Sequence, residues 1–291
     1  MKPLEALSFL ITLTLIIFEL SCTSPTKGCD DPNAVNYAFN ADEPCTLNAK
    51  DGDCPCVYPR LVFDYVARYS TSKNGKDSIV PWKDNLVLFN TKQQNYYLKR
   101  FSFFVSGIEL IKGGKNFSVI DSSLIPVKTS AKDSTLIKIS NNQNLFGQES
   151  KITAIGTFRE TGLFSELRFN IGLNDTENRA NIYNIKMPGS HPLNTDSLYV
   201  TKDFKLQHGK IWYQSDTLKT TKPQFIWLNN TQKINILIPP SVSFKQAEDA
   251  KLYLYFDFRK LFLEVDFKND NGITIEQKIR KGFENAFSVG K

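Results

Sequence analysis

Short segments in which apolar and polar residues alternate recur from residue 61 to residue 261, separated by turn-forming residues. Alternation with a period of two is the pattern of a strand that buries one face. The segments are Leu61–Tyr69, Asn85–Asn90, Tyr96–Lys112, Phe117–Asp121, Thr135–Ser140, Lys151–Phe158, Leu167–Leu173, Gly209–Ser215, Pro223–Leu228, Lys233–Ile238 and Ala250–Leu261. No helical pattern falls between them, so a parallel α/β fold is not expected. The pattern predicts an all-β domain over residues 61–291, built as an antiparallel β-sandwich or a barrel-like sheet.

The segment Tyr96–Lys112 is the longest, and apolar residues occur on both of its faces. Phe103 belongs to one face, whereas Phe104 and Ile108 lie on or near the other. A strand that is apolar on both faces is typical of the centre of a sheet. We therefore expect this strand at the centre, with Gly107 at a β-bulge.

Near the C-terminus the apolar period changes from two residues to four. Ile275, Ile279 and Phe283 follow one another at this spacing, and Thr274 with Gln277 matches a capping box. The pattern predicts one short C-terminal helix that begins at Thr274 and docks on the sheet or covers an edge strand.

Residues 1–21 have the features of an export signal. Lys2 precedes a mostly apolar stretch that is too short to span a bilayer comfortably, and Ser21 stands directly before Cys22. A small residue before cysteine is the pattern of a bacterial lipoprotein signal, although Glu19 stands where an aliphatic residue is usual. We expect a lipid-anchored protein of the outer membrane, periplasmic or surface-exposed, that is held at Cys22 by acyl chains. Ordinary cleavage, with Cys22 free or paired, is the alternative.

The remaining cysteines all fall within residues 22–60, which we expect to form a small cysteine-rich collar before the β domain. They are Cys29, Cys45, Cys54 and Cys56. An even number of cysteines in an exported chain predicts two disulfides, for which three pairings are open. A metal knuckle is the rival interpretation, but the C-x-C spacing at its end and the absence of a nearby histidine disfavour it.

The collar resembles a short unit, GC-x-DP-x-A-x-NY followed by DG-x-C-x-Y, that is frequent in exported Bacteroidetes proteins. The matching residues begin at Gly28-Cys29 and end at Val57-Tyr58-Pro59. The spacing of its acidic residues is not that of an EF-hand loop. We expect its Asp and Asn side chains to cap turns.

Enzyme motifs and nucleic-acid features are missing from the chain. There is no G-x-S-x-G, H-E-x-x-H or glycine-rich phosphate loop. The net charge is +6, but the lysines occur singly between strand segments, as on an ordinary solvated surface. We expect a protein that is not an enzyme and does not bind nucleic acid. Tyr253, Tyr255 and the pair Trp212-Tyr213 could form a platform for sugars or proteins, or could lie in the core.

The candidate metal ligands are few. The chain contains His191 and His208 as its only histidines, and Met187 is its only methionine after the initiator. Two imidazoles and a thioether suit Cu(I) if the fold brings them together. The alternative is that His191 bonds to the loop backbone and shapes the turn before Pro192.

Four segments together resemble the MbnP-like family, which is widespread in Bacteroidetes lipoproteins and named for a methanobactin-associated periplasmic protein. They are residues 98–110 (LKRFSFFVSGIEL), residues 167–173 (LRFNIGL), His191-Pro192-Leu193-Asn194 with Leu198-Tyr199, and residues 284–289 (ENAFSV). The resemblance implies an all-β periplasmic or surface domain. It also implies a non-catalytic binding function, with copper as a ligand in some members and a di-haem peroxidase, or another envelope protein, as partner.

The chain departs from that family at the residues associated with copper. Val200 follows Tyr199 where the family has tryptophan, and Lys202 stands where a second tryptophan is common. A tryptophan-derived copper site is therefore not expected. The alternative function is a surface module that interacts with proteins or glycans without a metal.

Overall fold

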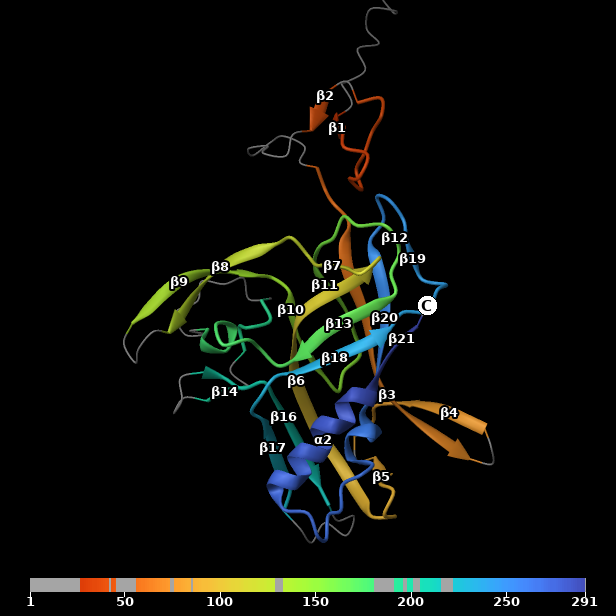
Figure 1. The fold of residues 1–291 in the computed structure, drawn as a ribbon, viewed down its shortest axis with the longest axis vertical. Coiled ribbons are helices and arrows are strands. Elements are labelled where there is room, and N and C mark those ends of the chain that lie inside the picture. Colours follow the sequence, from red (N-terminus) through yellow and green to blue (C-terminus); the bar gives the residue numbers. More distant parts are fainter. Residues whose placement is uncertain are drawn as a thin grey trace, which may run out of the picture. The chain divides into compact units, whose positions relative to one another are not determined.

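The longest strand of the computed structural model, β6 (Asn95–Lys112), lies in the middle of the larger sheet (Figure 1). The structure describes residues 27–41, 43–45, 56–73, 76–84, 86–128, 133–180, 191–195, 198–200, 205–215 and 222–290. The chain divides into two compact units, Met1–Tyr58 and Pro59–Lys291. Among the described residues, no helix is both long and apolar enough to cross a bilayer.

The described elements are mostly strands, which confirms the predicted all-β class. They are β1 (Lys27–Cys29), β2 (Glu43–Cys45), β3 (Arg60–Lys73), β4 (Lys76–Pro81), β5 (Val87–Phe89), β6, β7 (Lys115–Phe117), β8 (Ser122–Lys128), β9 (Ser134–Ser140), β10 (Gln143–Gly147), β11 (Lys151–Thr157), β12 (Gly162–Leu163), β13 (Glu166–Ile171), η1 (Glu177–Arg179), β14 (Tyr199–Val200), β15 (Lys205–Leu206), β16 (Gly209–Gln214), β17 (Gln224–Leu228), β18 (Gln232–Leu237), β19 (Ser243–Phe244), β20 (Ala250–Asp257), η3 (Phe258–Phe262), α2 (Gly272–Ala286) and β21 (Phe287–Gly290).

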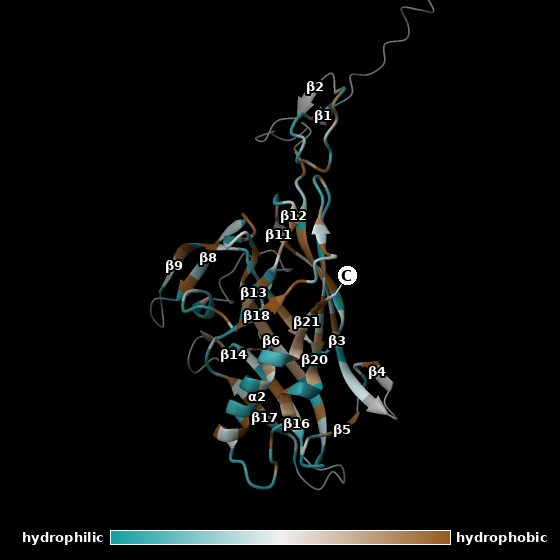
Figure 2. Ribbon diagram, turned by 45° about the vertical axis from the view of Figure 1, so that its right-hand side comes forward, coloured by the Kyte–Doolittle hydropathy of each residue, from teal (hydrophilic) through white to brown (hydrophobic). Residues whose placement is uncertain are grey.

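Two sheets form the sandwich. The larger has the order β17-β16-β6-β13-β18, with β5, β7 and β10 also paired to β6. The smaller has the order β11-β3-β20-β21, with β4 paired to β3. Apolar residues recur along the strands of both sheets (Figure 2). The main core lies between them and is rich in aromatic rings, such as Phe103, Phe256 and Phe283.

Strand β6 pairs with neighbours on both of its edges, and near Phe103 and Phe104 both of its faces are covered. Phe103 belongs to the core between the sheets, whereas its neighbour Phe104 belongs to a second apolar cluster with residues of β8, β9 and the segment 193–206. The pairing of β6 with β13 shifts register between Arg168 and Asn170, opposite Gly107, which has φ of 60°. The predicted central strand and its bulge at Gly107 are confirmed.

Helix α2 contacts β17 and β18, the two ends of the larger sheet, and also contacts β21 of the smaller sheet. Its buried face carries Ile275, Ile279 and Phe283, as predicted. The predicted N-cap, Thr274, is wrong by three residues. Asn271 is the N-cap, because its side-chain oxygen accepts a hydrogen bond from the Thr274 N–H over 2.9 Å.

Two strand predictions need correction, and one strand pairing differs from an antiparallel sandwich. The predicted strand Ala250–Leu261 ends at Asp257, whose carboxylate accepts a hydrogen bond from the Arg259 N–H and starts a 3-10 turn. The predicted strand Phe117–Asp121 is replaced by β7, which ends at Phe117. The sheets are not purely antiparallel, because β20 runs parallel to β3.

Among the described residues of the small unit, the disulfide Cys29–Cys56 joins two of the four collar cysteines. Asp31 accepts a hydrogen bond from the Asn33 N–H over 2.9 Å and another from the Tyr58 hydroxyl over 2.9 Å, so it caps a turn as expected. Cys29 and Cys56 are joined to each other, so the nearby Cys29–Asp30–Cys56 group does not offer two thiolates to a metal. Cys54 and the side chain of Cys45 lie outside the described residues, as does Cys22.

Candidate functional site

His208 is built into the larger sheet. It precedes β16, its carbonyl accepts a hydrogen bond from the Phe104 N–H over 2.9 Å, and its side chain is only 8% exposed. Nδ1 of the ring accepts a hydrogen bond from the Leu173 N–H over 2.9 Å. The ring packs against Gly172, where an added Cβ would lie 2.5 Å from His208 Nδ1. These contacts give His208 a structural role in joining two segments.

His191 stands at the start of a tight turn. Its Nδ1 accepts a hydrogen bond from the Leu193 N–H over 3.2 Å, and its carbonyl accepts one from the Asn194 N–H over 2.8 Å. These bonds match the alternative expected from the sequence, in which His191 bonds to the loop backbone and shapes the turn. Burial lowers the pKa of the His191 imidazole. The ring is therefore neutral at neutral pH, and Nε2 carries its proton because Nδ1 is an acceptor.

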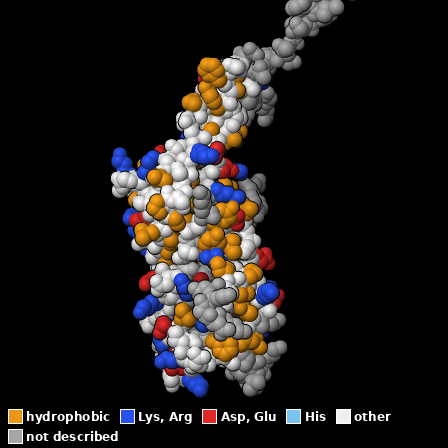
Figure 3. All heavy atoms as spheres, turned by 90° about the vertical axis from the view of Figure 1, so that its right-hand side faces the viewer, with side chains coloured by type: hydrophobic (Ala, Val, Ile, Leu, Met, Phe, Trp, Pro, Cys, Tyr) orange, Lys and Arg blue, Asp and Glu red, His pale blue; other side chains and the backbone are white. Residues whose placement is uncertain are grey.

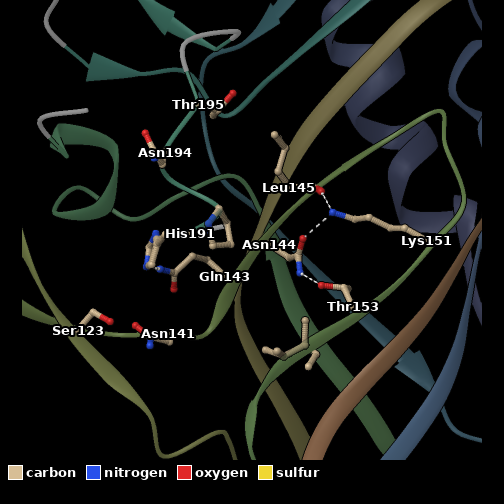
Figure 4. A pocket seen from close by; sticks show the side chains of 13 residues that line it. Ser123, Asn141, Gln143, Asn144, Leu145, Lys151, Thr153, His191, Asn194 and Thr195 are labelled. Atoms are coloured by element: carbon tan, nitrogen blue, oxygen red, sulfur yellow. Dashed lines mark hydrogen bonds between the residues drawn. The ribbon is translucent and has the colours of Figure 1, made fainter. Parts of the chain in front are cut away.

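The His191 ring faces a polar cavity of about 510 Å³ (Figure 4). This volume is within the usual range for small-molecule sites. Four segments supply the wall: β8, the stretch from Asn141 through β10, β11, and the turn 191–195. The described wall residues are Ser123, Asn141, Gln143, Asn144, Leu145, Lys151, Thr153, Ala154, Ile155, His191, Pro192, Asn194 and Thr195. Amides and hydroxyls dominate, and none of these described wall residues carries a carboxylate.

Two amides of this wall have unmet hydrogen-bonding capacity. Asn141 Oδ1 and Gln143 Oε1 are buried without a hydrogen-bond partner, and Gln143 is only 2% exposed. A buried polar atom left without a bond costs about 1–3 kcal/mol. Among the described residues, only Gln232 has another such atom. The unmet polar groups therefore gather at the cavity.

The contact between Gln143 and His191 shows that turning the carboxamide does not satisfy all of its polar atoms. Gln143 Nε2 lies 3.5 Å from His191 Nε2. Because the ring nitrogen carries a proton, the carboxamide gains a hydrogen bond when it is turned so that Oε1 faces the ring. Its amino group then takes the position that has no partner. In either orientation, at least one polar atom of this buried amide is unsatisfied.

At the opposite end of the wall, the polar groups form hydrogen bonds with one another. Lys151 Nζ donates to Asn144 Oδ1 over 2.9 Å and to the Leu145 carbonyl, while Asn144 Nδ2 donates to Thr153 Oγ1 over 2.8 Å (Figure 4). Desolvation lowers the pKa of the Lys151 ammonium. This network fixes the Asn144 carboxamide. Lys151 is the single cation among the described wall residues.

Of the three predicted copper ligands, the two that the structure describes, His191 and His208, do not present their ring nitrogens to one cavity. His191 and His208 line different cavities, and each uses Nδ1 to accept a backbone N–H. Met187 lies outside the described residues. The two described imidazoles therefore do not fit a shared copper ion, and we derive no chemistry through one.

The sequence reasoning found His191 but missed its amide neighbours. Asn141, Gln143 and Asn144 belong to a run of four consecutive amide residues, Asn141-Asn142-Gln143-Asn144. That run is the sequence signal that could have indicated them. It has no apolar alternation, so it was not recognised as the start of a strand.

No protein-family model matches the chain, and no curated protein matches it in sequence. Among solved structures, MbnP from Methylosinus trichosporium is similar over 71% of this chain and 78% of that chain. The TM-score is 0.38 and the sequence identity is 13%. A similarity of this extent is at most one of distant fold, and it carries no ligand or activity. Membership of the MbnP-like family stays a prediction from the sequence motifs.

Proposed function

We propose that this protein is a non-catalytic binding protein of the cell envelope whose β domain takes a small, uncharged, hydrogen-bonding ligand beside His191. The observation that carries the proposal is the buried, unsatisfied Gln143 amide on the wall of a polar cavity. A fold optimised for stability alone would pair or replace this group. A ligand that supplies the missing hydrogen bond offsets the free-energy cost of burying the unpaired amide.

The composition of the wall narrows the ligand class. Amides and hydroxyls both donate and accept, which suits ligands whose own groups do both, as sugar hydroxyls do. The neutral His191 ring and the internally bonded Lys151 leave little charge to attract an anion. We therefore propose a neutral mono- or disaccharide as the ligand.

The proposed location rests on the sequence. Anchoring at Cys22 by acyl chains is supported by the signal-like residues 1–21 and is consistent with the Cys29–Cys56 disulfide, since disulfides persist in oxidising compartments. Acyl labelling that persists in a Cys22→Ser variant would refute the anchor.

Ligand-observed NMR with a panel of neutral mono- and disaccharides tests the cavity. We expect the protein to bind a member of the panel and Gln143→Leu to lose that binding, while its thermal stability is unchanged or raised by about 1 kcal/mol. Gln232→Leu is the matched control, because Gln232 also carries a buried unpartnered Oε1 but is not part of the cavity wall.

Two outcomes count against this proposal. One is that no saccharide binds, and the other is that Gln143→Leu binds as the unmodified protein does. A Cu(I) titration of the protein and of His191→Ala tests the copper function that the family resemblance implies. Tight binding that depends on His191 would replace the saccharide proposal with a metal site.

A further inference from the structure

A second surface, on the larger sheet, combines exposed aromatic rings with cations. In β16, Lys210 and Trp212 project outward, whereas their neighbours Gly209, Ile211 and Tyr213 are buried. On β17 the residues opposite them are Trp227 and Phe225, and on β6 they are Ser102 and Arg100. Directly opposite residues on antiparallel strands project to the same face. These six side chains therefore form two rows of three, which we name the aromatic–cationic face.

The rings and cations of this face are in contact. Lys210 Nζ lies 4.9 Å from the ring centre of Phe225 and 4.7 Å from that of Trp227, and the two rings are 5.9 Å apart. Trp212 is 40% exposed and Phe225 is 54% exposed. Large aromatic side chains exposed side by side are uncommon on a surface without a partner.

The charge of this face has one sign. Strands β5 and β17 contain no charged residue, and β16 and residues 95–104 of β6 contain lysine and arginine but no aspartate or glutamate. By contrast, acidic and basic side chains are interspersed on the face shown in Figure 3. The complement of the aromatic–cationic face is therefore an anionic partner with flat apolar rings.

We propose that the aromatic–cationic face binds an acidic polysaccharide built from uronic acids. The C–H face of a pyranose ring packs on an aromatic ring, and a uronate carboxylate forms charge-assisted hydrogen bonds with Lys210 or Arg100. Neighbouring strands are about 4.8 Å apart and alternate residues about 7 Å apart, so both kinds of contact repeat along an extended chain. This surface is separate from the His191 cavity, and either proposal can fail alone.

A single-stranded nucleic acid also offers rings and anions to such a surface. The Cys29–Cys56 disulfide favours the polysaccharide, because disulfides persist in oxidising compartments, where envelope polysaccharides are found. Nucleic-acid binding is therefore an outcome that the test must separate.

Isothermal titration with hexagalacturonate tests this proposal, with maltohexaose and single-stranded oligothymidine as competing probes. We expect binding of hexagalacturonate alone. Trp212→Ala and Lys210→Gln should each weaken it about tenfold, with a shallower salt dependence for Lys210→Gln. Leu237→Ala, at an 82% exposed position of β18, and Lys251→Gln, at an exposed position of β20, are the matched controls. Unchanged thermal unfolding shows that the variants are folded.

The proposal is overturned if hexagalacturonate does not bind, or if the two face variants bind as the controls do. Oligothymidine binding of equal strength would assign the face to nucleic acid or to polyanions in general. Gln143→Leu should leave hexagalacturonate binding unchanged.

Discussion

His208 and His191, the two histidines of the chain, lie in surroundings of opposite kind. His208 is enclosed, with its ring on Gly172 and its Nδ1 bonded to a buried backbone N–H. His191 shapes a turn with one side of its ring and faces an unsatisfied amide with the other. The first arrangement increases stability, whereas the second leaves hydrogen-bonding capacity unused beside a cavity. The difference shows that residue type alone does not distinguish a histidine with a structural role from one that lines a polar cavity.

The largest expected effect tests the enclosure of His208. Gly172 has φ of 108°, and an added Cβ would lie 2.5 Å from His208 Nδ1. We expect Gly172→Ala to lower the free energy of unfolding by about 3 kcal/mol, from backbone strain and the displaced ring. Urea unfolding measures this. Gly113→Ala is the control, because Gly113 also has a positive φ but has no atoms within 4 Å of an added Cβ. Equal losses in both variants would show that His208 is not confined.

A smaller effect separates the two histidines directly. His208→Ala removes the acceptor of a buried N–H, so we expect a loss of about 2 kcal/mol. His208→Asn, which can offer an oxygen near the position of Nδ1, should recover part of that loss. His191→Ala should change stability by less than about 0.5 kcal/mol, because its turn is partly open to water. A larger loss for His191→Ala than for His208→Ala in urea unfolding would reverse the assignment of roles.

The smallest effect is the pH dependence that His191 contributes. Burial lowers the folded-state pKa of His191 below the unfolded value of about 6.5. The unfolded chain therefore binds more protons as the pH falls through that value, and the folded state loses stability until its own lower pKa is passed. Stability differences between the protein and His191→Gln, measured at neutral and mildly acidic pH, should show this loss only in the unmodified protein. A pH-independent difference would mean that the ring is not desolvated.

Strands with strict alternation were predictable from sequence, and those that form the cavity were not. β13, β18 and β20 alternate along their length and bury the expected face. β10 begins with amides, and β8 contains Pro126 next to Ile125, so neither resembles a half-buried strand. Their positions follow from pairing, β10 with the long β6 and β8 with β9. His191 could be singled out by its rarity, but its neighbour Gln143 depends on long-range pairing that no local pattern encodes.

The parallel pairing of β3 with β20 constrains how the β domain is made. It aligns Leu61 with Ala250, and beside it Arg60 forms an ion pair with Asp249 over 3.3 Å. The two central strands of the smaller sheet, β3 and β20, are thus neighbours in space but distant in the chain. A chain that ends before Ala250 has no partner for this edge of β3, so the smaller sheet closes only after synthesis is nearly complete. Because the paired segments are far apart in the chain, this late closure is expected to slow the folding of the β domain.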